Sequence, residues 1–234
     1  GTDRVEDEAL RRAVDGVDEP VFYRGEQCGV VRKYSDHLLT VLLNARRPEK
    51  FRHPGLLNSI EELQFIRKKI EAREEPWKSA FECMKASKWA SLKYKPRPRE
   101  TISSGFSGAG GGAGGSFDES DDAIAAYTQA LMWIFTNDEQ YAENAVRILN
   151  AWSILKSHEG PNWYLTAAWA GSMFPQGAEL IRATYPKWKQ EDRAAFSKML
   201  NRAFLPILHN RLSYGNRELA VINALMAIGV FNDD

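Results

Sequence analysis

Apolar residues recur at three- and four-residue spacing along most of residues 59–231, and this helical period limits the possible folds more than any other feature of the chain. Residues 118–135 show it clearly, because their apolar side chains fall on one face of a helix. The pattern repeats over residues 141–152, after the turn residues Asn137 and Asp138. Two amphipathic helices joined by so short a turn run antiparallel, so the sequence predicts helical hairpins.

Capping and proline signals set the limits of the other expected helices. Ser59-Ile-Glu-Glu62 is a capping box, in which a hydroxyl and a carboxylate satisfy backbone N–H groups reciprocally, so a helix should begin there and run to about Arg73. Pro76 suits the first position of a second helix. Further helices are expected over residues 162–184, with a kink at Pro175 as an alternative to a straight helix, over residues 191–208 despite Pro206, and over residues 218–231. Successive antiparallel helices of this kind predict a mainly α, layered α/α array.

The first 52 residues have a different pattern. Residues 5–14 and 35–47 have the character of short helices, and between them residues 20–34 predict two strands around a Gly-containing turn. This is the only clear β signal in the chain. We therefore expect a small α+β segment, composed of a helix, a hairpin and a helix, at residues 1–52, followed by a helical domain at residues 53–234.

The balanced charge disfavours several broad classes of partner. Lys and Arg together number 31, equal to Asp and Glu, and the pI is near 7.1, so no net field favours nucleic acid or an acidic membrane. No apolar stretch approaches the roughly 18 residues of a membrane span, and the first residues do not resemble a secretory signal. Two cysteines and four scattered histidines match no metal motif, so neither a metal ion nor another cofactor is expected.

Several motifs in the helical part occur in a recognisable order. They are His53-Pro-Gly-Leu-Leu-Asn58, Glu75-Pro-Trp-Lys-Ser79, Ala125-Ala-Tyr127, Ile148-Leu-Asn-Ala-Trp-Ser153, Leu165-Thr-Ala-Ala-Trp169, Ala178-Glu-Leu-Ile-Arg182 and Gly215-Asn216. From about His53 onward the chain resembles the alginate lyase family, whose members are uronate-polysaccharide lyases built on an incomplete α/α toroid. The resemblance implies that fold, an acidic polysaccharide partner and a periplasmic or secreted location. Further family residues, an arginine and a tyrosine, would fall beyond Asp234, so we expect the domain to be truncated at its C-terminus.

The resemblance also implies β-elimination beside a uronate carboxylate, with Asn216 as the site asparagine. Charge gathers on the carboxylate as the C5 proton leaves, and a side-chain amide can donate hydrogen bonds to it. Asn at a helix start is also a common N-cap, which is the alternative role for Asn216. Arg217 stands where the family commonly has an aromatic residue or histidine, and its guanidinium can pair with the carboxylate. Within this chain Tyr214 and Tyr164 are the candidates for the acid or base, and neither matches a catalytic position of the family. The alternative for Arg217 is a solvated surface residue, and the alternative for Tyr214 is an ordinary aromatic residue in a loop.

Aromatic residues near this helix entrance are candidates for stacking on sugar rings. Trp163 and Tyr164 open the helix expected over residues 162–184, so we expect them to be exposed, and Trp169 lies on the same helix. Aromatic residues at helical spacing are also common in hydrophobic cores, so burial in the core is the alternative to sugar binding for Trp163, Tyr164 and Trp169. His209, at the end of the preceding helix, completes the expected substrate-binding set.

Residues 103–116 form a glycine-rich tract that contains a G-x-G-x-x-G pattern. No strand is expected before it and no Gly-Lys-Ser follows it, so a phosphate-binding loop is disfavoured. The tract is instead expected to be a flexible linker or, alternatively, a mobile lid over a saccharide groove.

The first segment contains the strings Arg11-Arg-Ala-Val-Asp-Gly-Val-Asp-Glu-Pro-Val-Phe-Tyr-Arg-Gly25, Tyr34-Ser-Asp36 and Ala45-Arg-Arg-Pro-Glu-Lys-Phe51. These resemble a segment of phage small terminase-like DNA-packaging proteins. Three functions are therefore open. The leading one is a uronate-polysaccharide lyase, the second a non-catalytic carbohydrate-binding module or truncated lyase, and the third a DNA-packaging component. Acidic residues interleave with the basic ones in the first segment, so nucleic acid is the least favoured partner.

Overall fold

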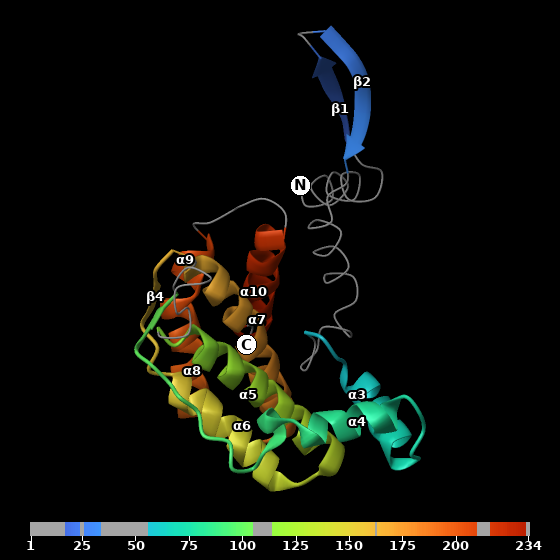
Figure 1. The fold of residues 1–234 in the computed structure, drawn as a ribbon, viewed down its shortest axis with the longest axis vertical. Coiled ribbons are helices and arrows are strands. Elements are labelled where there is room, and N and C mark those ends of the chain that lie inside the picture. Colours follow the sequence, from blue (N-terminus) through green and yellow to red (C-terminus); the bar gives the residue numbers. More distant parts are fainter. Residues whose placement is uncertain are drawn as a thin grey trace, which may run out of the picture. The chain divides into compact units, whose positions relative to one another are not determined.

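The computed structural model describes residues 17–23, 26–33, 56–104, 114–161, 163–209 and 216–232. By its internal contacts the chain divides into two compact units, Gly1–Arg52 and His53–Asp234. The described part of the first unit is an antiparallel hairpin of β1 (Val17–Tyr23) and β2 (Glu26–Lys33) (Figure 1). The two strands predicted within residues 20–34 are thus confirmed, whereas the helices predicted on either side of them lie outside the described residues.

The second unit is mainly helical, as the sequence predicts. Its α-helices are α3 (Ile60–Glu71), α4 (Trp77–Ala86), α5 (Ser116–Thr136), α6 (Glu139–Trp152), α7 (Trp163–Thr184), α8 (Gln190–Ala203), α9 (Leu205–His209) and α10 (Asn216–Asn232). The capping box at the start of α3 is formed as predicted. The Ser59 hydroxyl accepts from the Glu62 N–H at 3.2 Å, and the Glu62 carboxylate accepts from the Ser59 N–H at 2.9 Å.

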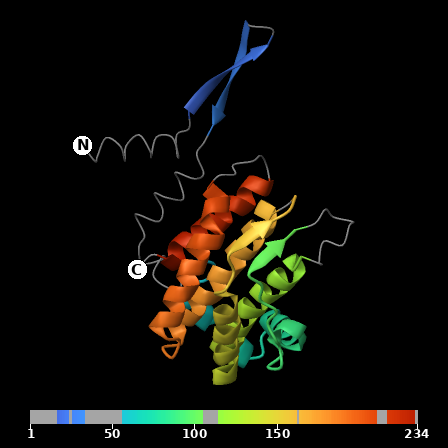
Figure 2. The same ribbon diagram turned by 90° about the vertical axis from the view of Figure 1, so that its left-hand side faces the viewer.

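Helices α5, α7 and α10 lie side by side and run in the same direction (Figures 1 and 2). The indole of Trp133, near the end of α5, donates a hydrogen bond of 3.1 Å to Thr184, at the end of α7. Arg217, near the start of α10, donates one of 3.0 Å to Tyr164, near the start of α7. This layer of parallel helices therefore brings the N-terminal ends of its members to one side of the domain.

Helix α6 runs opposite to this layer and forms a helical hairpin with α5. Its first residue, Glu139, accepts a hydrogen bond of 2.9 Å from the Tyr185 hydroxyl, just beyond the end of α7. Its last residue, Trp152, donates one of 2.7 Å to Asp122, near the start of α5. The antiparallel arrangement predicted for these two helices is confirmed. Their direction alternates because each turn is too short to carry the chain across the domain.

The structure contains a second pair of strands that the sequence does not predict. β3 (Thr101–Ser103) and β4 (Ser157–Glu159) pair in parallel, so the expectation of only one β element was wrong. Each strand has three residues, which is too short for an alternating pattern to be recognised. β3 leads into the glycine-rich tract, and Ser103 donates a backbone hydrogen bond of 2.9 Å to the Gly114 carbonyl. Residues 105–113 of the tract lie outside the described residues, so the linker and the lid both remain predictions.

The helix predicted over residues 191–208 is two helices, and the prediction of one was wrong. α8 ends at Ala203 and α9 begins at Leu205, with Phe204 between them. Pro206 explains the break, because it has no N–H to donate and its ring clashes with the carbonyl four residues earlier. The N–H groups of Ile207 and Leu208 both donate to the Phe204 carbonyl instead.

Aromatic rings fill the space between the parallel layer and the helices that cover it. The contacting pairs are Trp152 with Phe174, Phe174 with Phe196, Trp188 with Phe196, and Phe196 with Phe231. All five side chains are buried, and their rings come from or adjoin α6, α7, α8 and α10. Rings at these distances, 5.4 to 6.4 Å between centres, contribute packing energy beyond the area they bury.

Gly177 in α7 and Gly229 in α10 should respond oppositely to replacement by alanine. At Gly177 a Cβ would stand 2.9 Å from the Tyr127 backbone nitrogen, so Gly177→Ala should lower the free energy of unfolding by about 1–3 kcal/mol through overpacking. At Gly229 a Cβ would meet nothing within 4 Å, so Gly229→Ala should raise it by up to about 1 kcal/mol through helix propensity. Chemical denaturation of both variants measures this, and equal effects would contradict the close approach of α7 to α5.

Candidate functional site

Two of the predicted site residues meet where α7 and α10 begin. Arg217 donates from Nη1 to the phenol oxygen of Tyr164 at 3.0 Å, across 53 residues of sequence. The Trp163 ring lies edge-on to the Tyr164 ring, with centres 6.4 Å apart and planes at 86°. Arg217 is exposed, and Trp163 and Tyr164 are half-buried. A cation, a hydroxyl and an indole are thus placed together at the N-terminal ends of two parallel helices.

The other two residues considered for catalysis cannot be positioned in this cluster. Asn216 is the first residue of α10, which agrees with its predicted place at a helix start, but its side chain is not described. Tyr214 lies outside the described residues. His209 is the last residue of α9 and is exposed. In the part of the chain that the structure describes, no hydrogen bond joins His209 to Tyr164 or Arg217.

The three aromatic candidates differ in their exposure. Trp163 and Tyr164 are half-buried, so they are less accessible than the sequence predicts, because they contact each other and Arg217 covers the Tyr164 hydroxyl. Trp169, further along α7, is 56% exposed and is therefore not a core residue. Trp169 presents the largest apolar surface of the three to a ligand.

A buried carboxylate and histidine support this end of the domain. Glu119, in the first turn of α5, lies 2.8 Å from Nε2 of His158, in β4, and both side chains are fully buried. Nδ1 of His158 lies 3.3 Å from the Ala203 carbonyl, at the break between α8 and α9. A carbonyl only accepts, so Nδ1 carries a hydrogen and Nε2 faces the carboxyl group. Burial raises the pKa of Glu119, which favours the neutral carboxyl, and in that form its O–H can be donated to Nε2.

The Glu119–His158 pair ties together the elements that lead into the candidate site. β4 precedes α7, α5 follows the glycine-rich tract, and α9 precedes the segment that leads to Asn216. The Phe204 ring packs on the imidazole, with centres 4.8 Å apart. These contacts join the first turn of α5 and β4 to the break between α8 and α9.

Replacement of Glu119 by glutamine should change how stability depends on pH. The folded protein holds the Glu119 proton above pH 4.5, where an unfolded chain releases it, so this stabilisation is complete below that pH and is lost as pH rises. As the pH rises above 4.5, the wild type should therefore lose stability relative to Glu119→Gln, whose side chain does not titrate. The loss in free energy of unfolding should be up to about 1.4 kcal/mol per pH unit. Denaturation curves at several pH values measure it, and a constant difference above pH 4.5 would show that Glu119 is ionised in the fold.

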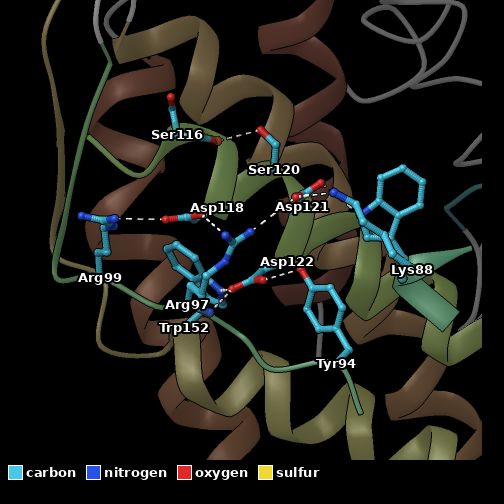
Figure 3. Close-up of polar contacts among 11 residues, drawn as sticks. Lys88, Tyr94, Arg97, Arg99, Ser116, Asp118, Ser120, Asp121, Asp122 and Trp152 are labelled. Atoms are coloured by element: carbon cyan, nitrogen blue, oxygen red, sulfur yellow. Dashed lines mark hydrogen bonds and ion pairs between the residues drawn. The ribbon is translucent and has the colours of Figure 1, made fainter. Parts of the chain in front are cut away.

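The acidic residues at the start of α5 form a structural network (Figure 3). Asp122 accepts three hydrogen bonds, from the Tyr94 hydroxyl at 2.6 Å, the Arg97 backbone N–H at 2.6 Å and the Trp152 indole at 2.7 Å. Asp121 pairs with Lys88 at 2.7 Å. Burial raises the pKa of Asp122, although its three donors favour the charged form. The network fixes the segment before β3 against α5 and α6.

Asp118, in the same turn, is also paired. Its carboxylate lies 2.9 Å from the Arg97 guanidinium and 3.0 Å from that of Arg99 (Figure 3). Because Asp118 is engaged by two guanidinium groups, we assign it to the structure of the domain. Among the described residues, no group of three or more His, Cys, Asp or Glu side chains is placed to hold a metal ion.

The family of the helical unit is identified by its sequence. A sequence model of the alginate lyase family matches residues 88–234, which is more than half of the chain. The protein belongs to the alginate lyase family. Searches among curated proteins and among solved structures found no match. The resemblance of residues 1–52 to small terminase-like proteins lies outside the matched region and stays a prediction.

The motifs that carried the family resemblance serve largely as contacts between helices. Asn58 accepts a hydrogen bond of 3.1 Å from the Tyr127 hydroxyl, and Asn150 accepts one of 2.9 Å from the Trp188 indole. Trp152 is the buried donor to Asp122. In this chain these residues therefore contribute to the packing of the helical unit. None of the helices in the described residues is both long enough and apolar enough to cross a membrane.

Proposed function

We propose that this domain is a polysaccharide lyase that cleaves a uronate polymer such as alginate by β-elimination. Membership in the alginate lyase family, through the match over residues 88–234, is the observation that carries the proposal. The contact between Tyr164 and Arg217 supports it, because a cation and a hydroxyl that lie side by side can together bind a carboxylate.

The reaction removes the C5 proton, forms a C4–C5 double bond and breaks the bond from C4 to the glycosidic oxygen, which takes up a proton. As the proton leaves, negative charge moves onto the uronate carboxylate. We assign stabilisation of that charge to the Asn216 amide, with the Arg217 guanidinium as a second donor. Tyr214 is the proposed acid or base, because a phenol can exchange a proton with either position.

Tyr164 is proposed to bind the sugar through its hydroxyl. Its oxygen accepts from Arg217, so its own O–H hydrogen points away from the guanidinium and is free to be donated to a ligand. Trp163 restricts the Tyr164 ring from the side, and the exposed face of Trp169 is suited to stacking on a pyranose ring. His209 completes the proposed substrate-binding set.

The direction of the helices favours an anionic substrate at this end. Helices α7 and α10 begin side by side, and the unpaired N–H groups of a helix start carry partial positive charge. The layer of parallel helices, with α6 running the other way, is compatible with an incomplete α/α toroid, which we propose for the domain. A periplasmic or secreted location follows from the same assignment, because polymeric uronates occur outside the cytoplasm.

A non-catalytic carbohydrate-binding module is the second candidate. Arg217 occupies the position where the family commonly has an aromatic residue or histidine, and an arginine there could grip a carboxylate without taking part in proton transfer. Such a module would bind the same polymers and release no products.

Ultraviolet absorbance separates the two candidates. The protein is incubated with polymannuronate, polyguluronate and glucuronan, and with a neutral glucan as the control. A lyase produces unsaturated uronate ends that absorb in the ultraviolet, so at least one uronate polymer should give a steady rise and the glucan none. Retention on a uronate polymer without any rise would replace the lyase with the binding module.

A further inference from the structure

A cavity of about 360 Å³ lies at the end of the domain opposite the candidate site. It opens between the last turns of α7 and α10 and one face of α8. Its charged lining residues are Arg182, Arg193 and Lys198, and no Asp or Glu is among the described residues that line it. The cavity therefore presents positive charge to whatever enters it.

Arg193 provides the strongest indication of a ligand. Its Nε is buried and has no hydrogen-bond partner within the described ranges, and no ion pair of its guanidinium is found there. Arginine stays charged and carries five N–H donors, so a buried donor left without an acceptor destabilises the protein. An anion in the cavity would supply that acceptor. Arg182 differs, because it donates to the Phe231 carbonyl at 2.6 Å and its guanidinium lies 5.8 Å from the centre of the Phe231 ring.

Part of the uncharged wall of the cavity consists of polar side chains that hydrogen-bond to one another. The Ser197 hydroxyl donates to Oδ1 of Asn232 at 2.7 Å, and Nδ2 of Asn232 donates to Oδ1 of Asn201 at 2.7 Å. The side-chain oxygen of Asn201 is therefore already engaged as an acceptor. The Asn201 amide N–H groups keep no acceptor among the residues described, so they are available to hydroxyl or carboxylate oxygens of a ligand.

We propose that this cavity binds a uronate unit, at a place separate from the candidate active site. Arg193 and Lys198 would hold the carboxylate, and the amides of Asn201 and Asn232 the ring hydroxyls. The volume lies within the roughly 300–1,000 Å³ range of small-molecule sites. The identity of the sugar rests on the proposed function. A second point of attachment would strengthen binding of long polymers over short ones, since the two sites would act together.

Sodium glucuronate is the probe for the test, titrated into the whole protein while backbone amide shifts are followed by nuclear magnetic resonance. Shifts are expected at Arg193, Asn201 and Asn232, with a dissociation constant on the order of 1 mM. Arg193→Ala should weaken this binding about 10-fold or more, through loss of a charged hydrogen bond. Lys198→Ala, which removes an exposed side chain and should not affect folding, is expected to weaken it as well.

Lys189→Ala is the matched control, because Lys189 is an exposed cation at the start of the same helix and does not line the cavity. This variant should bind glucuronate as wild type does, and glucose should cause no shifts. The proposal is overturned by an absence of shifts, by shifts confined to the starts of α7 and α10, or by equal binding of inorganic phosphate or acetate. Binding here and formation of unsaturated products are separate readouts, so either assignment can fail while the other stands.

Discussion

Replacement of Asp122 with alanine should lower the free energy of unfolding by about 3–5 kcal/mol, the largest stability loss expected in this domain. Asp122 accepts from Tyr94, Arg97 and Trp152, and the Trp152 indole is fully buried. Alanine leaves all three donors without an acceptor, and a buried donor without a partner costs about 1–3 kcal/mol. Chemical denaturation followed by circular dichroism measures the loss.

Two variants serve as controls for this prediction. Asp122→Asn keeps one carbonyl oxygen in the same place, so it should lose less stability than Asp122→Ala. Glu100→Ala removes a carboxylate that pairs with Lys156 at 2.8 Å on the exposed surface, and it should cost no more than about 1 kcal/mol. Equal losses for Asp122→Ala and Glu100→Ala would mean that the network around Asp122 does not hold the fold.

Replacement of Asn216 with alanine should lower kcat on a uronate polymer by about 10²–10³-fold, as loss of one donor to a developing oxyanion typically does. The helix would also lose its first polar residue, with a stability cost of about 1 kcal/mol if Asn216 is the cap. Initial rates of ultraviolet absorbance at saturating polymer measure kcat.

Asn216→Asp separates the two roles of this residue. Aspartate caps a helix as well as asparagine does, so a capping role alone would leave activity nearly unchanged. An amide that donates to the substrate carboxylate cannot be replaced by a second carboxylate, so we expect the same loss of kcat as in Asn216→Ala. Full activity of Asn216→Asp would remove Asn216 from the catalytic role.

The helices were predictable because their apolar period is long and their ends carry local signals. The capping box at Ser59 and the turn at Asn137 mark boundaries that the structure reproduces. The misses arise where a strand is too short to show a period and where a proline interrupts an apolar pattern. Three-residue strands such as β3 show no period, and Pro206 breaks a helix whose apolar pattern continues through it.

The candidate site was predictable only in part. Tyr164 was selected because it stands at a helix start, and Arg217 because it follows Asn216 and can pair with a carboxylate; the structure places the two in contact. The pairing of Glu119 with His158 joins residues 39 positions apart, and no local pattern indicates it. The cavity around Arg193 was missed for a similar reason, since its three cations come from α7 and α8 and only the fold brings them together.

The mass of the oligosaccharides released from a uronate polymer is the decisive measurement. β-Elimination leaves a C4–C5 double bond at each new non-reducing end, so every product should be one water molecule lighter than the hydrolysis product of the same length. We expect products of that mass from wild type and their near absence with Asn216→Ala. Products with the mass of hydrolysis, or no products from any uronate polymer, would contradict the assignment of this domain as a lyase.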